Sequence, residues 1–367
     1  MKGKVLLLGG AGFIGSHTAD LLAKEGYSIR IMSSLCPPTH DGSWPEYLLH
    51  KNYELVLGDV TIKEDMIKVL EGVDYVFHFA AFIDQLPQFS TFFETNTVSV
   101  ALLYELILEK KLPVKKIIYA SSQFVYGDGI YRTKDGMEFF PNLRDLENFN
   151  QKIWNFSDKG GKEVDFIPFK EDQKLNPTNC YGISKIAGEQ ITLKLGKTYG
   201  IPSTVVRYSI VQGSRQSPLN FYSGALRIFV CQALAGQTIT VTEDGNQLRD
   251  FVNVTDVARA NLLILENSRT DFEIFNVGGG VGYKIKDFAQ MVKKITHSTS
   301  EILIDGRFRR SDTRNAVSDI TKLTSFGWSP KNTPEQSIKE YVDWIKASKY
   351  DILDLANKIK EGAKKLV

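Results

Sequence analysis

A run of glycines directly after the first apolar segment narrows the possible folds more than any other feature. Residues 4–8, "KVLLL", predict a buried strand, and the apolar spacing of "AGFIGSHTADLLAKEGY" predicts a helix that begins straight after it. Gly9, Gly12 and Gly15 stand at three-residue intervals in the turn between the two. Glycine lets a chain turn sharply and lets backbone amides approach a pyrophosphate, whose charge the helix N-terminus attracts. The turn predicts a dinucleotide-binding unit, with purely steric use of the glycines as the alternative.

The same alternation of strand and helix continues through the first 209 residues. Strands are predicted at 28–32, 53–59, 73–81, 114–122 and 202–209, with helices notably at 61–71, 92–110 and 181–199. Strands rich in Val, Ile and Leu that alternate with helices indicate a parallel sheet covered on both faces. The predicted fold class is α/β, a Rossmann-type doubly wound parallel sheet with a smaller α/β C-terminal substrate domain.

The pattern loosens after residue 209, which suggests a second domain. Helices are predicted at 223–236, 253–267, 284–296, 334–347 and 350–365, and strands at 238–242 and 273–280. We expect a Rossmann domain over 1–206 plus about 250–277, and a nucleotide-sugar-binding domain over 207–249 and 278–367. An insertion at 128–176 shows little periodicity, and a segment of that length is usually functional or carries small elements of its own.

Charge and cysteine content limit the possible partners. The 45 basic and 43 acidic residues leave a net charge of +2 without a basic face, so neither nucleic acid nor a membrane is the expected partner. No apolar run approaches the length that crosses a bilayer, so a cytoplasmic protein is expected. Cys36, Cys180 and Cys231 lack metal-ligand spacing, which predicts no metal site and no structural disulfide.

The stretch "YGISK" holds a candidate for proton transfer. Tyr181 and Lys185 stand at positions i and i+4 and so share one helix face. A free phenol has a pKa of ~10, but a neighbouring ammonium and a nicotinamide cation both favour the phenolate. Ser122, at the end of the strand "IIYASS", could hydrogen-bond the same oxygen. Such pairs also arise by chance in helices, so the prediction depends on their combination with the glycine turn and with a serine at the ligand-binding edge of a sheet.

The residues that would hold the adenosine half of a dinucleotide leave the cofactor open. The second strand ends in Ser33 and Ser34, where an NAD-preferring fold usually has an acid for the ribose 2′-hydroxyl. NAD is expected, and NADP stays possible because no carboxylate would repel its 2′-phosphate. Asp59 could accept a hydrogen bond from the adenine or could cap the following helix.

At this point the chain resembles the extended short-chain dehydrogenase/reductase family, in its sugar-nucleotide epimerase and dehydratase branch. The resemblance covers nearly the whole chain and rests on "GGAGFIGSH", "GDV", "HFAA", "SSQFVYG", "YGISK", "RYSIVQG" and "RDFVNVTDVARA". It implies that Ser122 is a proton shuttle, Tyr181 the base and Lys185 a ribose ligand that modulates its pKa. It also implies that Arg249 contacts a substrate phosphate.

The two positions after Ser122 distinguish the members of that branch. The dehydratases that the chain resembles carry an Asp-Glu pair there, whereas this chain has Gln123 and Phe124. What remains is 4-epimerisation or simple 4-keto reduction. Two long stretches, "SSLCPPTHDGSWPEYL" and "SRQSPLNFYSGALRIFVCQALAGQTITVTEDGNQLRDFV", are similar to those of dTDP-L-rhamnose 4-epimerases, but Ser33 and an insertion without cysteine pairs depart from them.

Two sets of site residues follow from the motifs and the resemblance. The expected cofactor-binding residues are Gly9, Gly12, Phe13, Ile14, Gly15, Ser33, Ser34, Asp59, Val60, Phe79, Ala80, Ala81, Asn96, Tyr181 and Lys185. The expected substrate-binding residues are Gln123, Arg207, Asn220, Tyr222, Arg249 and Arg314. Guanidinium groups match phosphate geometry, although structural salt bridges are an alternative for the arginines. Packing is an alternative for Asn220 and Tyr222.

The leading functional hypothesis is a nucleotide-diphosphosugar 4-epimerase, for a dTDP- or UDP-linked hexose or 6-deoxyhexose, that passes through a transient 4-keto sugar with tightly bound NAD. An NAD(P)H-dependent 4-ketoreductase is the second hypothesis, and a non-catalytic nucleotide sensor is the third. Helices 92–110 and 181–199 carry apolar residues beyond one stripe. That pattern would suit a four-helix homodimer interface, with burial inside the monomer as the alternative.

Overall fold

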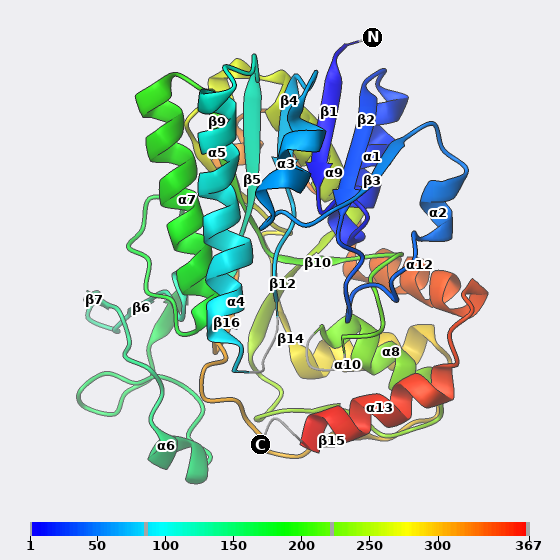
Figure 1. The fold of residues 1–367 in the computed structure, drawn as a ribbon. Coiled ribbons are helices and arrows are strands. Elements are labelled where there is room, and N and C mark those ends of the chain that lie inside the picture. Colours follow the sequence, from blue (N-terminus) through cyan, green and yellow to red (C-terminus); the bar gives the residue numbers. More distant parts are fainter. Residues whose placement is uncertain (1, 84–86, 221–223, 365–367) are drawn as a thin grey trace.

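A seven-stranded, fully parallel sheet forms the centre of the protein (Figure 1). The computed structural model describes residues 2–83, 87–220 and 224–364. The strand order is β13-β9-β5-β4-β1-β2-β3. These strands are β1 (Lys4–Leu8), β2 (Ser28–Ser33), β3 (Glu54–Leu57), β4 (Tyr75–His78), β5 (Lys116–Ser122), β9 (Ser203–Tyr208) and β13 (Ile274–Val277). The predicted doubly wound sheet is confirmed.

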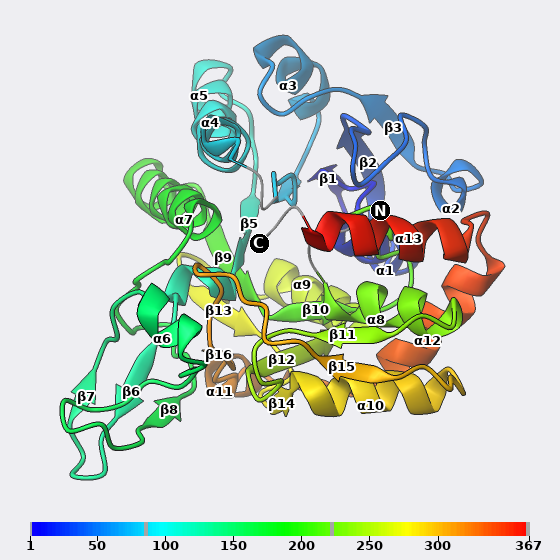
Figure 2. The same cartoon turned by 90° about the horizontal axis from the view of Figure 1, so that it is seen from below.

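Helices cover both faces of this sheet, as the view from below shows (Figure 2). One face carries α3 (Lys63–Leu70), α5 (Ser99–Glu109) and α7 (Cys180–Tyr199), and the other carries α1 (Phe13–Lys24) and α9 (Val254–Glu266). Side chains of β1 alternate between two cores: Val5 and Leu7 join the α1–α9 side, while Leu6 and Leu8 join the α3–α5 side. Burial on both faces explains the unbroken apolar runs of the sequence.

The second domain lies below the carboxyl edge of the large sheet (Figure 1). Phe229, Phe251, Phe288 and Tyr341 are in its core. Its helices are α8 (Ala225–Leu234), α10 (Ile285–Ile295), α12 (Pro334–Ala347) and α13 (Ile352–Lys364), whereas the short α11 (Thr321–Thr324) packs on β13 of the large sheet. Its strands are β10 (Ile210–Gln212), β11 (Ile239–Val241), β12 (Leu248–Asn253), β14 (Gly282–Lys284), β15 (Ile302–Ile304) and β16 (Asn315–Ala316). Within the described ranges, no helix has both the length and the apolar character that a membrane span needs.

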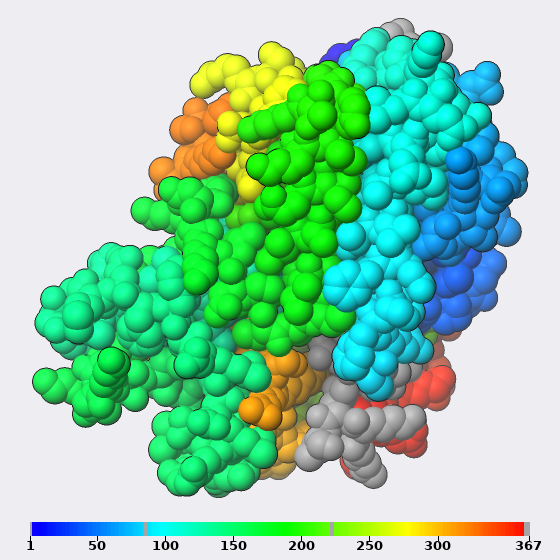
Figure 3. Space-filling view, turned by 60° about the vertical axis from the view of Figure 1, so that its left-hand side comes forward, coloured from blue at the N-terminus to red at the C-terminus, as the bar shows by residue number. Residues whose placement is uncertain are grey.

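The insertion at 128–176 carries small elements of its own, as its length suggested. It contains an antiparallel sheet in the order β7-β6-β8 and one short helix. This part of the chain projects from the body of the protein (Figure 3). The elements are β6 (Ile130–Arg132), β7 (Glu138–Phe139), β8 (Asp165–Ile167) and α6 (Leu146–Asn150).

The predicted helix at 92–110 differs from the structure. It begins earlier, with α4 (Phe89–Phe93), and then widens into one π-helical turn, η1 (Glu94–Val98), before α5. Such turns occur frequently at functional sites. Here the turn contains Asn96, whose contacts are described below. The remaining short elements are α2 (Glu46–Leu49), η2 (Gln123–Tyr126) and η3 (Ser268–Thr270).

Candidate active site

The glycine turn after β1 has the geometry of a phosphate cradle. Gly9 has a φ of +75°, and a Cβ there would lie 2.6 Å from the Ala80 nitrogen. A Cβ on Gly15 would lie 2.7 Å from the Gly10 Cα, so this glycine allows α1 to pack closely on the turn. Gly12, the N-cap of α1, is different, because its Cβ would approach only the Gly9 oxygen, at 3.2 Å. With no acidic residue in its first turn, the N-terminus of α1 suits a pyrophosphate.

We expect Gly12→Val to lose bound dinucleotide while the fold survives. The backbone of Gly12 is extended, with a φ of −70°, so a side chain fits there once the Gly9 carbonyl, 3.2 Å from the added Cβ, moves slightly, but it would occupy the space that a pyrophosphate needs. Affinity should fall about tenfold or more, a change of roughly 1.4 kcal/mol. Chromatography of the nucleotide released from acid-precipitated protein measures occupancy. Gly160→Val, in the insertion, is the matched control, and full occupancy in Gly12→Val would contradict the prediction.

The residues expected near the adenosine half lie at the ends of β2 and β3. Ser33 is buried and accepts a hydrogen bond from the Leu35 nitrogen at 3.3 Å, while Ser34 is exposed. The Asp59 Oδ1 accepts hydrogen bonds from the Thr61 nitrogen and hydroxyl, both at 2.8 Å. The capping alternative for Asp59 is wrong, because α3 begins at Lys63 with Ile62 as its N-cap. Val60 is buried beside it.

The structure brings Ser122, Tyr181 and Lys185 together. β5 ends at Ser122, and α7 begins at Cys180, where the Asn179 side chain accepts from the Gly182 nitrogen. The Ser122 hydroxyl is near enough to the Tyr181 phenol to lower the pKa of that phenol as a hydrogen-bonding neighbour. The Lys185 Nζ donates to the Ala120 carbonyl at 2.8 Å and lies 5.8 Å from the centre of the Tyr181 ring.

Burial sets the electrostatics of this cluster. It raises the pKa of Tyr181, and the hydrogen bond to Ser122 partly offsets that rise. It lowers the pKa of Lys185 to about 7, against the attraction of Glu189. Without ligands the phenol is therefore neutral at neutral pH, and the lysine is close to its titration point. Ionisation of Tyr181 depends on positive charge being brought near it.

The shifted pKa of Lys185 predicts a pH-dependent stability. The unfolded state keeps its proton up to a pKa of ~10.4, whereas the folded state loses it near 7, so folding releases a proton between these values. Stability of the cofactor-free protein should therefore rise as the pH increases from about 7 to 10, relative to Lys185→Met. Urea unfolding of both proteins at pH 6, 8 and 9.5 measures this difference. A difference that stays constant over this range would contradict the prediction.

Residues around the cluster hold it in place, and the sequence alone did not identify all of them. Asn96 is fully buried, and its amide bonds the Phe82 backbone and the Ser184 hydroxyl, at 2.9–3.0 Å. The backbone carbonyl of Asn96 accepts a hydrogen bond from the Tyr119 hydroxyl at 2.8 Å. A Cβ on Gly188 would clash with that hydroxyl oxygen. Asn96 thus supports the backbone after β4, where the expected cofactor residues Phe79, Ala80 and Ala81 lie. The Lys185 ammonium lies 4.9 Å from the centre of the Tyr119 ring.

The expectation that Arg207 contacts a substrate phosphate needs correction. Arg207 is 2% exposed, and its Nε and Nη2 donate to the two Glu189 oxygens at 2.9 and 2.7 Å. Its Nη1 donates to the Tyr126 hydroxyl and the Glu171 carbonyl. Glu189, one helical turn after Lys185, also accepts from the Ser121 hydroxyl. The salt-bridge alternative therefore holds for Arg207, and Glu189 is the residue that sequence reasoning missed.

The other expected substrate residues differ in their surroundings. Arg314 is 2% exposed and ion-paired with Glu243 and Asp244, so the structural alternative also fits it. Arg249 bonds Asp312 at 3.2 Å and two backbone carbonyls. Gln123 is buried, and among the described residues its amide finds no hydrogen-bond partner. Asn220 is buried, and Tyr222 lies outside the described residues.

No cluster of three or more His, Cys, Asp or Glu side chains that could hold a metal ion is found in the described part of the chain. The three cysteines are free thiols.

Comparison with known proteins places this site in a family. The family model described as "NAD dependent epimerase/dehydratase family" matches residues 5–144 and 157–278, well over half of the chain. The chain belongs to this family. The NAD-dependent epimerase/dehydratase assignment confirms the resemblance stated above, and it agrees with a glycine turn whose open face fits a dinucleotide. The protein is therefore an enzyme of this family, with NAD as the family's cofactor.

The similar proteins of this epimerase/dehydratase family match along almost their full length. A dTDP-L-rhamnose 4-epimerase of Burkholderia thailandensis is 30% identical over 93% of this chain and 94% of that protein. A putative UDP-glucose 4-epimerase of Methanocaldococcus jannaschii is 29% identical, over 93% and 98%. The solved structure of a UDP-glucose 4-epimerase with UDP-glucose, from Thermotoga maritima, has a TM-score of 0.75 at 29% identity and covers 94% of this chain and 98% of that one.

Proposed function

We propose that this protein is a nucleotide-diphosphosugar 4-epimerase that works through a 4-keto sugar with tightly bound NAD. The observation that carries the proposal is the Ser122–Tyr181–Lys185 cluster at the carboxyl edge of the sheet that also forms the glycine turn. The relatives named as 4-epimerases support the same chemistry. The two positions after Ser122, Gln123 and Phe124, offer no acid for a further elimination.

The residues of the chain would divide the work as follows. NAD, when bound, supplies the acceptor and donor of the C4 hydride. The Tyr181 oxygen takes the proton of the C4 hydroxyl and later returns it, and Ser122 shares that proton through its hydrogen bond. Lys185 stabilises the phenolate when it is charged. Arg249 binds the substrate phosphate. The rest of the second domain would let the 4-keto sugar turn so that its opposite face meets the cofactor and Tyr181.

The test is incubation of the purified protein, without added cofactor, with dTDP-, UDP-, GDP- and CDP-sugars. Proton NMR of the sugar H4 signals should show a C4 epimer growing to equilibrium with at least one of them. Tyr181→Phe is the control, since a contaminating epimerase would be unaffected by it. No epimer from any sugar, together with turnover of a 4-keto sugar when NADPH is supplied, would overturn the proposal.

One observation favours the second candidate, an NAD(P)H-dependent 4-ketoreductase. β2 ends at Ser33 without a carboxylate that would repel a 2′-phosphate. A reductase needs fresh cofactor in each turnover, whereas the epimerase keeps it. Dinucleotide that copurifies in near-equal molar amount would therefore favour the epimerase.

We also propose a homodimer formed through α4–α5 and α7. These helices lie side by side on one face of the protein (Figure 3). Together with η1, which joins α4 to α5, they expose apolar side chains that a partner would bury, among them Phe89, Val98, Leu108 and Ile183. Sedimentation of the wild-type protein and of a Val98→Glu variant tests the proposed homodimer. A cytoplasmic location stays a prediction.

A further inference from the structure

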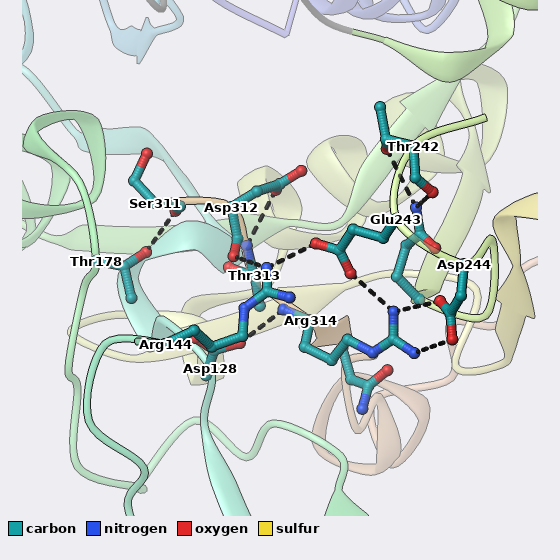
Figure 4. Close-up of polar contacts among 12 residues, drawn as sticks. Asp128, Arg144, Thr178, Thr242, Glu243, Asp244, Ser311, Asp312, Thr313 and Arg314 are labelled. Atoms are coloured by element: carbon teal, nitrogen blue, oxygen red, sulfur yellow. Dashed lines mark hydrogen bonds and ion pairs between the residues drawn. The ribbon is translucent and has the colours of Figure 1, made fainter. Parts of the chain in front are cut away.

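A buried network of charged side chains joins the insertion to the second domain (Figure 4). Arg144, from the insertion, is 6% exposed, and its Nη2 donates to the Glu243 Oε1 at 2.8 Å and to the Asp312 carbonyl at 2.7 Å. Glu243 also accepts, through Oε2, from the Arg314 Nη1 at 2.8 Å. One carboxylate thus holds two guanidinium groups, one from each side of the boundary.

Further contacts tie the insertion and the segment that follows it to the same loop. The Arg314 nitrogen donates to the Asp128 Oδ1 at 2.6 Å, and the Arg314 Nε donates to the Asn155 Oδ1 at 2.9 Å. Thr178, three residues before Tyr181, donates to the Ser311 carbonyl at 2.9 Å. Loop 311–314 is therefore held by the start and the middle of the insertion and by Thr178, two residues beyond its end.

Aromatic packing reinforces the contact. The Arg144 guanidinium lies 4.5 Å from the centre of the Phe149 ring. Phe149 in turn stacks on Phe308 of the second domain, with ring centres 4.2 Å apart and planes nearly parallel. The insertion is consequently packed into the substrate domain and is more than a surface appendage.

The network leads directly to the candidate phosphate ligand. The Arg249 Nη2 donates to the Asp312 Oδ1 at 3.2 Å, and its Nη1 donates to the Arg314 carbonyl at 3.1 Å. Arg144 holds the backbone of that same Asp312. The chain of contacts runs from Arg144 through Asp312 to Arg249.

The network is also incomplete as it stands. The Arg144 Nε and Nη1 are buried without a hydrogen-bond partner in the part of the chain described, and so is the Thr313 hydroxyl. A buried donor left unpaired costs free energy, more so when it is charged, and native structures seldom leave one without a reason. Acceptor oxygens of a bound ligand are one such reason at this boundary.

We propose that the insertion forms the nucleotide-side wall of the substrate site, and that Arg144 is the positioning residue that fixes Asp312 and Arg249 for a nucleoside diphosphate. This inference rests on the proposed function, because it takes Arg249 as the phosphate ligand. It also assigns a purpose to a segment that the sequence left without one. The insertion would then act on substrate binding and hardly on the proton chemistry at Tyr181.

The test compares Arg144→Met with Arg132→Met, a matched change in the same insertion at an exposed pair with Glu138. In Arg144→Met, the KM for the nucleotide sugar and the Kd of UDP and dTDP by calorimetry should rise about ten- to a hundredfold, the range for losing hydrogen bonds to a charged group. The kcat should stay within about threefold, and Arg132→Met should resemble wild type. Arg144→Lys, which keeps the positive charge but lacks the planar guanidinium with its several donors, should recover part of the affinity.

A second measurement needs no variant and protects the test against misfolding of Arg144→Met. Saturating UDP or dTDP should slow amide hydrogen exchange in 141–155 and 311–316 together in the wild-type protein. Unchanged KM and Kd in Arg144→Met, or ligand protection of 311–316 without 141–155, would overturn the inference and leave the epimerase proposal intact. Conversely, nucleoside diphosphate binding that depends on Arg144 in a protein without epimerase activity would overturn the proposed function alone.

Discussion

Tyr181→Phe should lower kcat by about 10²–10⁴, the usual contribution of a positioned acid–base group, with little change in KM. The variant keeps the ring, which lies edge-on to Phe92 and Phe124 with centres 6.4 and 6.2 Å away, and removes only the oxygen that Ser122 bonds. The fold and the bound cofactor should therefore survive. Initial rates of epimer formation, followed by NMR under saturating sugar nucleotide, measure the loss.

Tyr199→Phe is the matched control for this result. Tyr199 lies at the end of the same helix, α7, and is exposed. Its variant should turn over at the wild-type rate. If Tyr181→Phe retained activity within threefold of wild type, the phenol would not be the base, and the mechanism proposed above would fail.

Arg207→Met should destabilise the protein by about 3–5 kcal/mol, the range for removing one partner of a buried ion pair. Among the described residues, Glu189, fully buried, would keep the Ser121 hydroxyl as its side-chain hydrogen-bond partner, and the Tyr126 hydroxyl would lose its cationic neighbour. Urea unfolding followed by tryptophan fluorescence gives the difference in the free energy of unfolding.

Two further variants separate this cause from a general packing defect. Arg207→Met combined with Glu189→Leu removes both charges of this ion pair and should recover most of the loss, because Glu189 is no longer buried without Arg207. Lys63→Met, which breaks an exposed pair with Glu109, should change stability little. A double variant as unstable as Arg207→Met alone would show that the ion pair is not the cause.

The arginines show why the sequence predicted the contact between Tyr181 and Lys185 better than its surroundings. Tyr181 and Lys185 are one helical turn apart, so their contact follows from local geometry. The partner of Arg207 is Glu189, on a different element, and the partner of Arg314 is Glu243, 71 residues away. Nothing in a sequence pattern distinguishes an arginine aimed at a phosphate from one aimed at a distant carboxylate.

Local rules also failed where the backbone departs from regular periods. The strands of the insertion are two or three residues long, which is too short for the alternation of apolar and polar residues in a strand to be recognised. The π-helical turn at Asn96 has no composition signal, because it depends on Asn96 bonding Phe82 and Ser184 from elsewhere in the fold. In contrast, the glycine turn combines steric need and ligand chemistry in the same residues, which explains its value in prediction.

The most direct test of the central claim is the fate of hydrogen at C4. A nucleotide sugar that is converted in the NMR panel should be prepared with deuterium at C4 and incubated with the protein in ordinary water without added cofactor. Hydride removal and return at the same carbon predicts a C4 epimer that keeps its deuterium. An epimer whose C4 position has gained protium from the solvent, or an epimer that forms only when NAD(P)H is added, would contradict the account.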